Sequence, residues 1–447
     1  MIPKTEPNYN FYIAKGRLPV VDRAEGIRIW DTGGKEYIDA CSGAVITNIG
    51  YGQVNINEVI QEQAQKTFFA YRLHFENKPA LDYSKALVAH SAQHLDRVFF
   101  VSGGSEAVES AIKLCRQYFY DRNQGSRHIF ISRVPSYHGC TLGALALTAY
   151  APLEAPYRPL IKSYPKIPAP YCYRCAYNLS YPDCNLECAR ELEKTILAQG
   201  PENVAGFIAE PIGGASTGAL VPPEGYFDII QATCSQYGVM LILDEVMTGF
   251  GRTGSLFGYE HWNIEADIVA LSKGMASGYF PLGAILARQS IVDTVLDSGG
   301  FKHGHTYAGN PMACAVGLKV LNTIIDQDLC TNARCMGTRL KEGLEAIARR
   351  TPVIGQVRGK GLLLGVELVR DPDTKEPYPI DVNVGQLLTD IAFENGLIIY
   401  PRRSINGMSG DHVLVAPPLI ISESEVDEIL FMFEKALEQT VKCIEKL

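Results

Sequence analysis

The sequence contains no apolar run long enough to cross a bilayer. No stretch of it reaches the roughly 20 uninterrupted apolar residues that a membrane helix needs. The first residues, MIPKTEPNYNFYIAKG, show no basic segment followed by an apolar one, so no secretory leader is predicted. We therefore expect a cytoplasmic protein without a membrane partner, in a compartment where thiols are reduced.

Basic charge and cysteine are also scarce. Lys and Arg number 41 against 49 Asp and Glu, and the net charge of −8 argues against nucleic acid or anionic lipid as a partner. The 12 cysteines among 447 residues are too dilute for a disulfide scaffold. With 47% hydrophobic and 20% charged residues the chain can bury a large core, and this composition excludes intrinsic disorder.

Short apolar segments alternate with helical ones up to about Gly309. The apolar segments read RVFFVS, HIFISR, VAGFIAEP, GVMLILDEV, DIVALSKG and LGAILAR. Strands this apolar are typical of a parallel α/β sheet that helices cover on both faces. Before them, GIRIWDTGGKEYIDA predicts a β-hairpin. After about Gly309, long helical stretches mix with antiparallel-type strands, which predicts a smaller α+β domain.

Two polar turns follow predicted strands, at the edge of the sheet where open α/β proteins bind ligands. The turn SGGSE, residues 102–106, opens a helix and can hold an anion on its backbone N–H groups. A plain turn with Ser105 as helix cap is the alternative. Tyr137, which precedes His138, can stack on a flat ring, although most tyrosines in such places are core or interface aromatics.

Two charged residues end further strands. Asp244 ends GVMLILDEV, where a carboxylate is costly unless it meets a cation such as a protonated pyridine nitrogen. A helix cap or a buried salt bridge would explain Asp244 equally well. Lys273 ends DIVALSKG and can form a Schiff base with an aldehyde cofactor, although most lysines are merely solvated. Together these four features are the parts that a pyridoxal phosphate site requires.

The chain resembles the class III (subgroup II) aminotransferases, fold-type I enzymes that depend on pyridoxal 5'-phosphate. The matching stretches span nearly the whole chain and read VSGGSEAVESAIKL, SYHGCTLGALALT, AEPIGGASTGALVPPEGYF, LILDEVMTGFGRTGSLFGYE, LSKGMASGYFPLGAIL, HGHTYAGNPMACAVGL, RGKGLLLGVEL and GDHVLVAPPLIISESEVDEIL. The resemblance implies an α/β fold with a mostly parallel, seven-stranded sheet in a large domain, and a small α+β domain. The implied parts are an N-terminal segment that joins the small domain, a large cofactor domain, and a linker helix with the C-terminal small domain, over residues 1–50, 51–310 and 311–447.

The resemblance also implies roles for the residues at the cofactor ring. Lys273 holds the cofactor as a Schiff base and moves the proton between substrate and cofactor. Asp244 pairs with the ring nitrogen and keeps it protonated. Val246 packs on the ring face opposite Tyr137, and His138 belongs to the same motif as Tyr137.

Other residues are expected at the rim of the cofactor. Gly104 and Ser105 bind the phosphate, and Glu210, in AEP, lies near the cofactor's hydroxyl side. Thr306, in GHTYAGNP, reaches the phosphate of the neighbouring subunit's cofactor, with an ordinary turn residue as the alternative. The implied assembly is a homodimer, or a tetramer, with active sites at the subunit interface, so a monomer should be inactive.

The chain departs from some relatives in the substrate pocket. Cys140 stands where members that bind glutamate or 2-oxoglutarate often carry Arg, and Ala215 aligns with a Glu that often neutralises a pocket Arg. Both absences weaken a γ-aminobutyrate or ornithine assignment, and AEPIGGASTGALVPP resembles the ω-amino acid and amine:pyruvate branch instead. There we expect Val45 to form the pocket wall. Arg402 and Arg403 are candidates for an arginine that receives a carboxylate, with exposed surface arginines as the alternative.

The implied activity is transfer of an amino group from an ω-amino acid or primary amine to a keto acid, with pyruvate expected, by a ping-pong mechanism. Epimerases, aminomutases and phospho-lyases share these motifs, so they stay open as alternatives. A non-catalytic regulator would need a DNA-binding module, and the net charge has the wrong sign for one.

One segment, Pro165 to Cys188, is rich in Pro, Tyr and Cys and is predicted to be a surface excursion. Its cysteines are spaced C-x2-C-x8-C-x3-C, at Cys172, Cys175, Cys184 and Cys188. Unligated thiols are the favoured interpretation, and no metal is assigned to the active site. A structural Zn²⁺ and a pair of disulfides are the alternatives.

Overall fold

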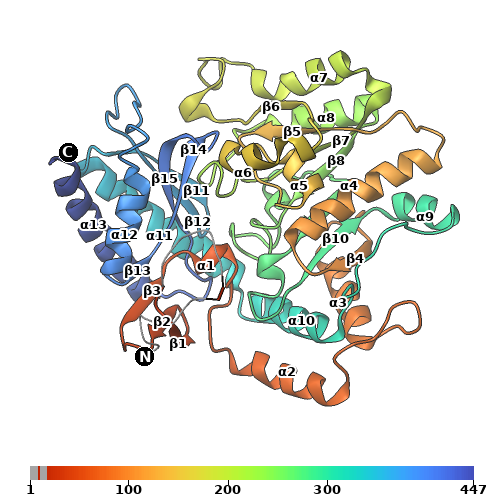
Figure 1. The fold of residues 1–447 in the computed structure, drawn as a ribbon, viewed down its shortest axis with the longest axis horizontal. Coiled ribbons are helices and arrows are strands. Elements are labelled where there is room, and N and C mark those ends of the chain that lie inside the picture. Colours follow the sequence, from red (N-terminus) through yellow and green to blue (C-terminus); the bar gives the residue numbers. More distant parts are fainter. Residues whose placement is uncertain (1–8, 11–17, 447) are drawn as a thin grey trace.

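The computed structural model describes residues 9–10 and 18–446. Figure 1 shows two lobes: the red N-terminal strands lie beside the blue C-terminal elements in one lobe, and the yellow, green and orange elements form the larger one. None of the described helices combines the length and the apolar character that crossing a membrane requires.

A seven-stranded sheet forms the centre of the larger lobe, in the order β4-β10-β9-β8-β7-β5-β6. Its strands are β4 (Arg97–Val101), β5 (Ile129–Val134), β6 (Lys166–Pro168), β7 (Val204–Ala209), β8 (Met240–Asp244), β9 (Ile268–Leu271) and β10 (Gly283–Ala287). Every residue of β7, β8, β9 and β10 is buried, as the apolar runs predict for a sheet covered on both faces.

Alternate residues of these strands pack into two different cores, because side chains along a strand point to opposite faces. In β8, Met240 and Ile242 join the core beneath α4, α5 and α9, while Leu241 and Leu243 join the core beneath α3, α7, α8 and α10. The helices of this lobe are α2 (Val54–Lys66), α3 (Lys78–His90), α4 (Gly104–Asp121), α5 (Leu142–Leu147), α6 (Ala151–Glu154), α7 (Glu187–Gln199), α8 (Tyr226–Tyr237), α9 (Gln289–Asp297) and α10 (Pro311–Asp326). Short 3₁₀ turns are η1 (Ala155–Leu160), η2 (Cys172–Arg174), η3 (Pro201–Asn203), η4 (Gly258–His261) and η5 (Lys273–Met275).

Two four-stranded sheets build the smaller lobe, in the orders β1-β2-β3-β13 and β11-β12-β15-β14. Their strands are β1 (Val21–Glu25), β2 (Arg28–Asp31), β3 (Glu36–Asp39), β11 (Ile354–Lys360), β12 (Leu363–Leu368), β13 (Leu397–Ile398), β14 (Tyr400–Ile405) and β15 (Ser409–Val415), with helices α1 (Ser42–Val45), α11 (Leu329–Arg350), α12 (Val384–Glu394) and α13 (Glu423–Ile444). The parallel pairing of β3 with β13 joins the early and late parts of the chain. The domain limits at residues 50 and 310 stay predictions.

The structure confirms the predicted hairpin, since β2 and β3 pair antiparallel around residues 32–35. It also confirms the mostly parallel, seven-stranded sheet. One of the predicted apolar strands is not parallel to the others. Strand β10 runs antiparallel to both β9 and β4. Only a short loop with η5 joins β9 to β10, and a parallel return would need a longer crossover.

Candidate active site

Five strands of the large sheet deliver the predicted residues to one edge. Strands β5, β7, β8 and β9 are parallel, and β4 shares their direction because β10 opposes both of its neighbours. Gly104, Tyr137 and Glu210 follow β4, β5 and β7, Asp244 ends β8, and Lys273 follows β9. Ligands of open α/β sheets bind at this carboxyl edge.

A cavity of about 760 Å³ opens at this edge, within the range of small-molecule sites. The predicted residues that line it are Gly104, Ser105, Tyr137, His138, Glu210, Asp244, Val246, Lys273 and Arg402. Its remaining wall is largely apolar and aromatic, from Ala44, Leu145, Tyr150, Leu153, Tyr157, Met247 and Tyr400. The sequence motifs therefore converge on one site.

Lys273 is held in an unusual backbone and electrostatic state. Its φ of 48° is left-handed, a conformation that is uncommon for a residue other than glycine. The side chain faces the cavity, and loss of hydration lowers the pKa of its amine to about 8, while the Asp244 carboxylate acts in the opposite direction. A Cβ on the next residue, Gly274, would lie 2.4 Å from Asn48 Nδ2, so only glycine fits beside the lysine.

The Asp244 carboxylate is fixed by His138, which follows β5, the second strand from β8 in the sheet order. His138 Nδ1 lies 2.8 Å from Asp244 Oδ2, and the Val246 N–H donates to Asp244 Oδ1 at 3.1 Å. Both side chains are buried, and the His138 N–H of the backbone donates to Thr148 Oγ1. The pairing leaves an oriented carboxylate on the cavity wall.

The N-terminus of α4 faces the same cavity. Its cap residue, Gly103, gives no side-chain hydrogen bond, so Ser105 is not the helix cap that the alternative interpretation supposed. A Cβ on Gly104 would approach Val246 Cγ1 to 2.9 Å, and the Cys140 N–H donates to Ser105 Oγ at 3.1 Å. Helix N–H groups beside a hydroxyl and a bare glycine suit a bound phosphate.

Glu210 is paired with the buried Arg133. Arg133 Nη2 donates to the Glu210 carbonyl at 2.6 Å and lies 3.3 Å from Glu210 Oε2. The Gly214 N–H donates to Glu210 Oε1 at 3.3 Å. Arg133 was missed from the sequence, although an arginine inside the apolar strand HIFISRV was a visible signal.

The structure does not bring Val45 to the cavity. Val45 is 1% exposed and packs with Ile212, Ala219 and Leu363, and Ala44 lines the cavity instead. The backbone is irregular here, with left-handed φ values of 52°, 63° and 57° at Ser42, Gly43 and Val45, so the side-chain directions do not follow those of a regular helix. The expectation for the pocket wall is therefore corrected by one residue.

The two candidate arginines are consecutive residues of β14, so their side chains point to opposite faces of the sheet. Arg403 Nε pairs with Asp411 Oδ1 at 3.2 Å, and its Nη2 donates to the Ile380 carbonyl at 2.8 Å. Arg402 instead lines the cavity, with its guanidinium 4.5 Å from the ring centroid of Tyr400. Within the described chain, Arg402 has no acidic partner, so its charge is available to a ligand.

Thr306 lies outside the cavity lining of its own chain. It is exposed, beside the exposed Tyr307. Its predicted contact with a second subunit stays a prediction.

Comparisons with known proteins agree with this geometry. The family model for aminotransferase class III matches residues 12–437. The chain is a class III aminotransferase. A Bacillus subtilis protein named uncharacterized aminotransferase YodT is 40% identical over 97% of this chain and 98% of its own length. A putrescine–pyruvate aminotransferase of Pseudomonas aeruginosa is 33% identical over 95% and 91% of the two chains. The crystal structure of an amine transaminase from an uncultivated Pseudomonas species, in its PLP-bound form, matches with a TM-score of 0.92 and 31% identity over 98% of this chain and all of the other.

Class III aminotransferases depend on pyridoxal phosphate, and the residues of this aminotransferase fit that cofactor. A partly desolvated amine, Lys273, faces an oriented carboxylate, Asp244, across the cavity. The uncapped start of α4 supplies an anion site beside Gly104, where any side chain would collide with Val246. An aldehyde, a ring nitrogen and a phosphate each find a matching group.

The cysteine-rich excursion lies apart from this site, between β6 and α7. All 12 cysteines are free thiols. In the described part of the chain, no three His, Cys, Asp or Glu side chains are already arranged to hold a metal ion.

The lowered pKa of Lys273 predicts how the apoprotein takes up its cofactor. The neutral amine attacks an aldehyde, so the rate of covalent uptake of pyridoxal phosphate should rise with pH through about 8. Since Asp244 opposes the fall in this pKa, Asp244→Asn should move the midpoint to lower pH. Stopped-flow absorbance with the apoprotein measures the rate, and Lys273→Met serves as the control without covalent uptake. A rate that is flat or falls through this pH range would contradict the assignment.

Proposed function

We propose that this aminotransferase moves an amino group from a primary amine or ω-amino acid to pyruvate by a ping-pong mechanism. The observation that carries the proposal is Arg402, the one arginine among the described residues that line the cavity, which has no carboxylate partner there. When bound, pyridoxal phosphate accepts the amino group from one substrate and passes it to the next.

The chain's own groups then divide the work. Lys273 Nζ holds the cofactor, and its pKa of about 8 lets it accept and return a proton near neutral pH. Asp244, oriented by His138 Nδ1, accepts the hydrogen bond of a protonated ring nitrogen. Tyr137 and Val246, which line the cavity, would enclose the ring, and the start of α4 with Ser105 would bind the phosphate.

Charge at the cavity wall favours a monocarboxylate acceptor. A dicarboxylate such as 2-oxoglutarate needs a cationic anchor for each end. Among the described lining residues Arg402 is the one arginine, while Cys140 and Ala215 also line the cavity, at the positions where the family resemblance implies Arg and Glu in other members. A bidentate arginine recognises one planar carboxylate well, which is what pyruvate presents.

The rest of the wall favours a donor with an uncharged body. Leu145, Leu153, Tyr157 and Met247 line the cavity and would contact the donor's chain. Relatives named for putrescine and pyruvate and for γ-aminobutyrate both occur, so the donor class is argued from the wall and not from a relative's name.

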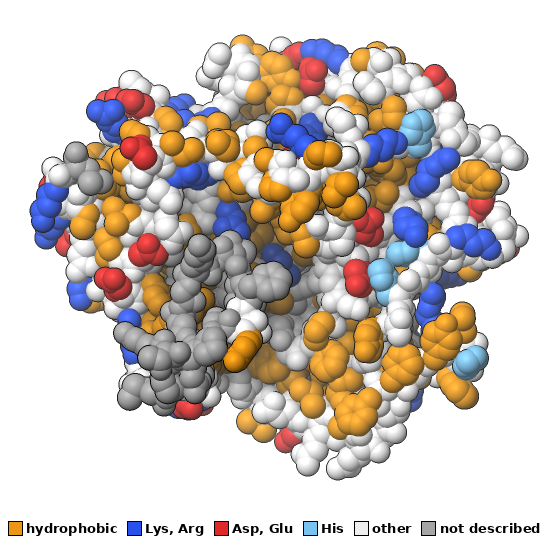
Figure 2. Space-filling model, viewed as in Figure 1, with side chains coloured by type: hydrophobic (Ala, Val, Ile, Leu, Met, Phe, Trp, Pro, Cys, Tyr) orange, Lys and Arg blue, Asp and Glu red, His pale blue; other side chains and the backbone are white. Residues whose placement is uncertain are grey.

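We further propose a homodimer, with Thr306 reaching the partner's phosphate. Figure 2 shows hydrophobic side chains gathered over α2, α3 and the segment between them. Exposed there are Phe68, Phe69, Tyr71, Leu73 and Phe75, with Tyr307 alongside. An apolar surface of this kind marks an interaction site, and its position beside Thr306 would complete two cavities at once. A cytoplasmic location stays a prediction from the sequence.

The experiment for the proposed reaction is a substrate panel with purified holoenzyme. A diamine, an aryl-alkyl amine and an ω-amino acid are each paired with pyruvate and with 2-oxoglutarate. We expect alanine to form in equal amount to the pyruvate consumed, with kcat/KM for pyruvate at least ~10-fold higher than for 2-oxoglutarate, a difference of about 1.4 kcal/mol. Racemisation or phosphate release without an acceptor, or a preference for 2-oxoglutarate, would refute the proposal. Sedimentation at assay concentration accompanies the panel, and an active monomer would refute the dimer.

Arg402 and Arg403 give a matched pair of variants for the acceptor site. Arg402→Ala should raise the KM for pyruvate by ~10- to 100-fold, since a charge-assisted contact is lost, with a smaller effect on kcat. Arg403→Ala should leave this KM nearly unchanged and lower thermal stability, because Asp411 loses its partner. Steady-state kinetics separates the two, and equal KM values for both variants and wild type would contradict the role of Arg402.

A further inference from the structure

The four cysteines of the excursion form a cluster that the catalytic cavity does not use. Cys172, Cys175, Cys184 and Cys188, hereafter the cysteine cluster, line a separate small cavity. Cys172 is the first residue of η2 and Cys175 follows this turn, while Cys184 precedes α7 and Cys188 is its second residue. Segments far apart along the excursion thus bring two pairs of thiols together.

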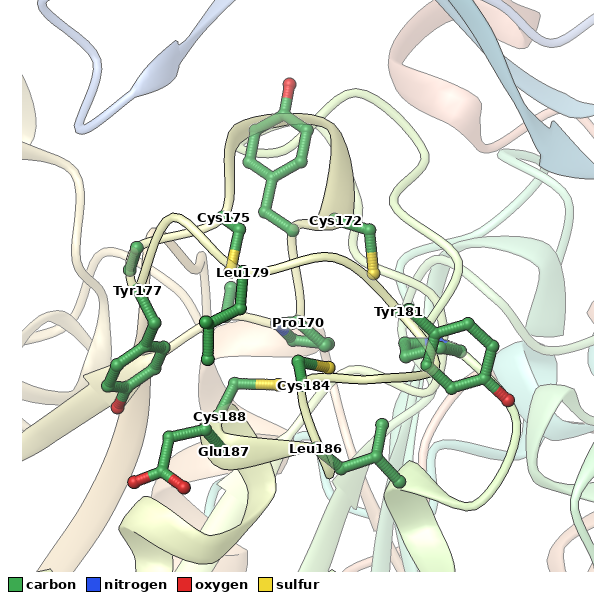
Figure 3. Close-up of a pocket in the computed structure, with 14 residues that line it drawn as sticks. Pro170, Cys172, Cys175, Tyr177, Leu179, Tyr181, Cys184, Leu186, Glu187 and Cys188 are labelled. Carbon is green, nitrogen blue, oxygen red and sulfur yellow. The ribbon is translucent and has the colours of Figure 1, made fainter.

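The cysteine cluster lines a cavity that has space for one small ion or molecule. Its cavity measures about 20 Å³, close to the space of a single water-sized sphere. Figure 3 shows Cys172 and Cys175 on one side of this pocket and Cys184 and Cys188 on the other. Each of the four is a free thiol, so no disulfide accounts for their proximity.

The surroundings supply no positive charge to these sulfurs. The described residues that line the pocket include no lysine or arginine. The one carboxylate among them is that of Glu187. Four soft donors around one small space, without an internal cation, match a divalent metal that prefers thiolates.

We propose that the cysteine cluster binds one Zn²⁺ through its four sulfurs. The spacing C-x2-C with a second cysteine pair is that of structural zinc sites, which are tetrahedral and closed. The described thiols do not yet surround a common metal position, so binding turns the sulfurs inward about their Cα–Cβ bonds. Each thiol loses its proton to solvent as its sulfur binds the ion, and no electron is transferred.

The metal would hold the excursion against the smaller lobe. Arg174 Nε pairs with the buried Glu367 Oε1 at 2.5 Å, and the Tyr171 hydroxyl donates to the same carboxylate. Arg358 binds Glu367 Oε2 at 2.5 Å and donates to the Thr217 carbonyl at 2.7 Å. The cysteine cluster thus lies next to Tyr171 and Arg174. These two residues link the excursion to Glu367 and, through Arg358, to the loop after Glu210. Its role is structural, so metal loss should lower stability more than the chemical step.

Metal analysis of the full-length holoenzyme tests the site. The protein is purified without a metal-affinity step, incubated with zinc chloride and desalted, and its metals are measured by plasma mass spectrometry. We expect about one zinc per chain in the wild type, as one closed four-thiolate site requires. The double variant Cys172→Ser/Cys184→Ser should lose it. Cys335→Ser and Cys443→Ser, which change exposed cysteines elsewhere, should retain it.

A second measurement covers a variant that fails to fold. Treating the wild type with a zinc chelator should lower its Tm, and added zinc should restore it, while Cys335→Ser behaves as the wild type does. A wild type that binds no zinc, that holds iron instead, or whose intact mass shows the hydrogen loss of disulfides would overturn the proposal. Zinc that remains in the double variant would overturn it as well.

Discussion

Desolvation of one amine, that of Lys273, is the constraint on which the site depends. An ammonium is costly where apolar strands converge, so its pKa falls to about 8 and the neutral form becomes available. Two carboxylates near the amine are each placed against a partner: Asp244 against His138, and Glu210 against Arg133. These pairs allow ionised groups to stand at the end of a sheet whose central strands are entirely buried.

Topology converts that constraint into a binding site. All strands of the large sheet except β10 point the same way, so residues widely separated along the chain meet at one edge. The reversed strand β10 lies between β4 and β9 and contributes no predicted site residue. The smaller lobe adds Tyr400 and Arg402 from β14, so the cavity is completed by the later part of the chain.

Much of this could be predicted from the sequence because the decisive signals are local. A charged residue at the end of an apolar run identified Asp244 and Lys273, and the short, continuously apolar segments predicted the sheet. The features that could not be predicted depend on which face of a strand each side chain points to and on contacts between distant parts of the chain. Arg402 and Arg403 are adjacent on β14, and only the pairing with β15 decides which of them meets Asp411. Ala44 lines the cavity in place of Val45, in an irregular turn with left-handed φ values at Ser42, Gly43 and Val45.

The central claim is that Lys273 carries the cofactor. Reduction of the holoenzyme with borohydride, followed by proteolysis and peptide mass spectrometry, tests it directly. We expect a mass increase equal to one reduced pyridoxyl phosphate group on the peptide that contains Lys273, and on no other peptide. The modification on another lysine, or an unmodified Lys273 in active protein, would contradict it.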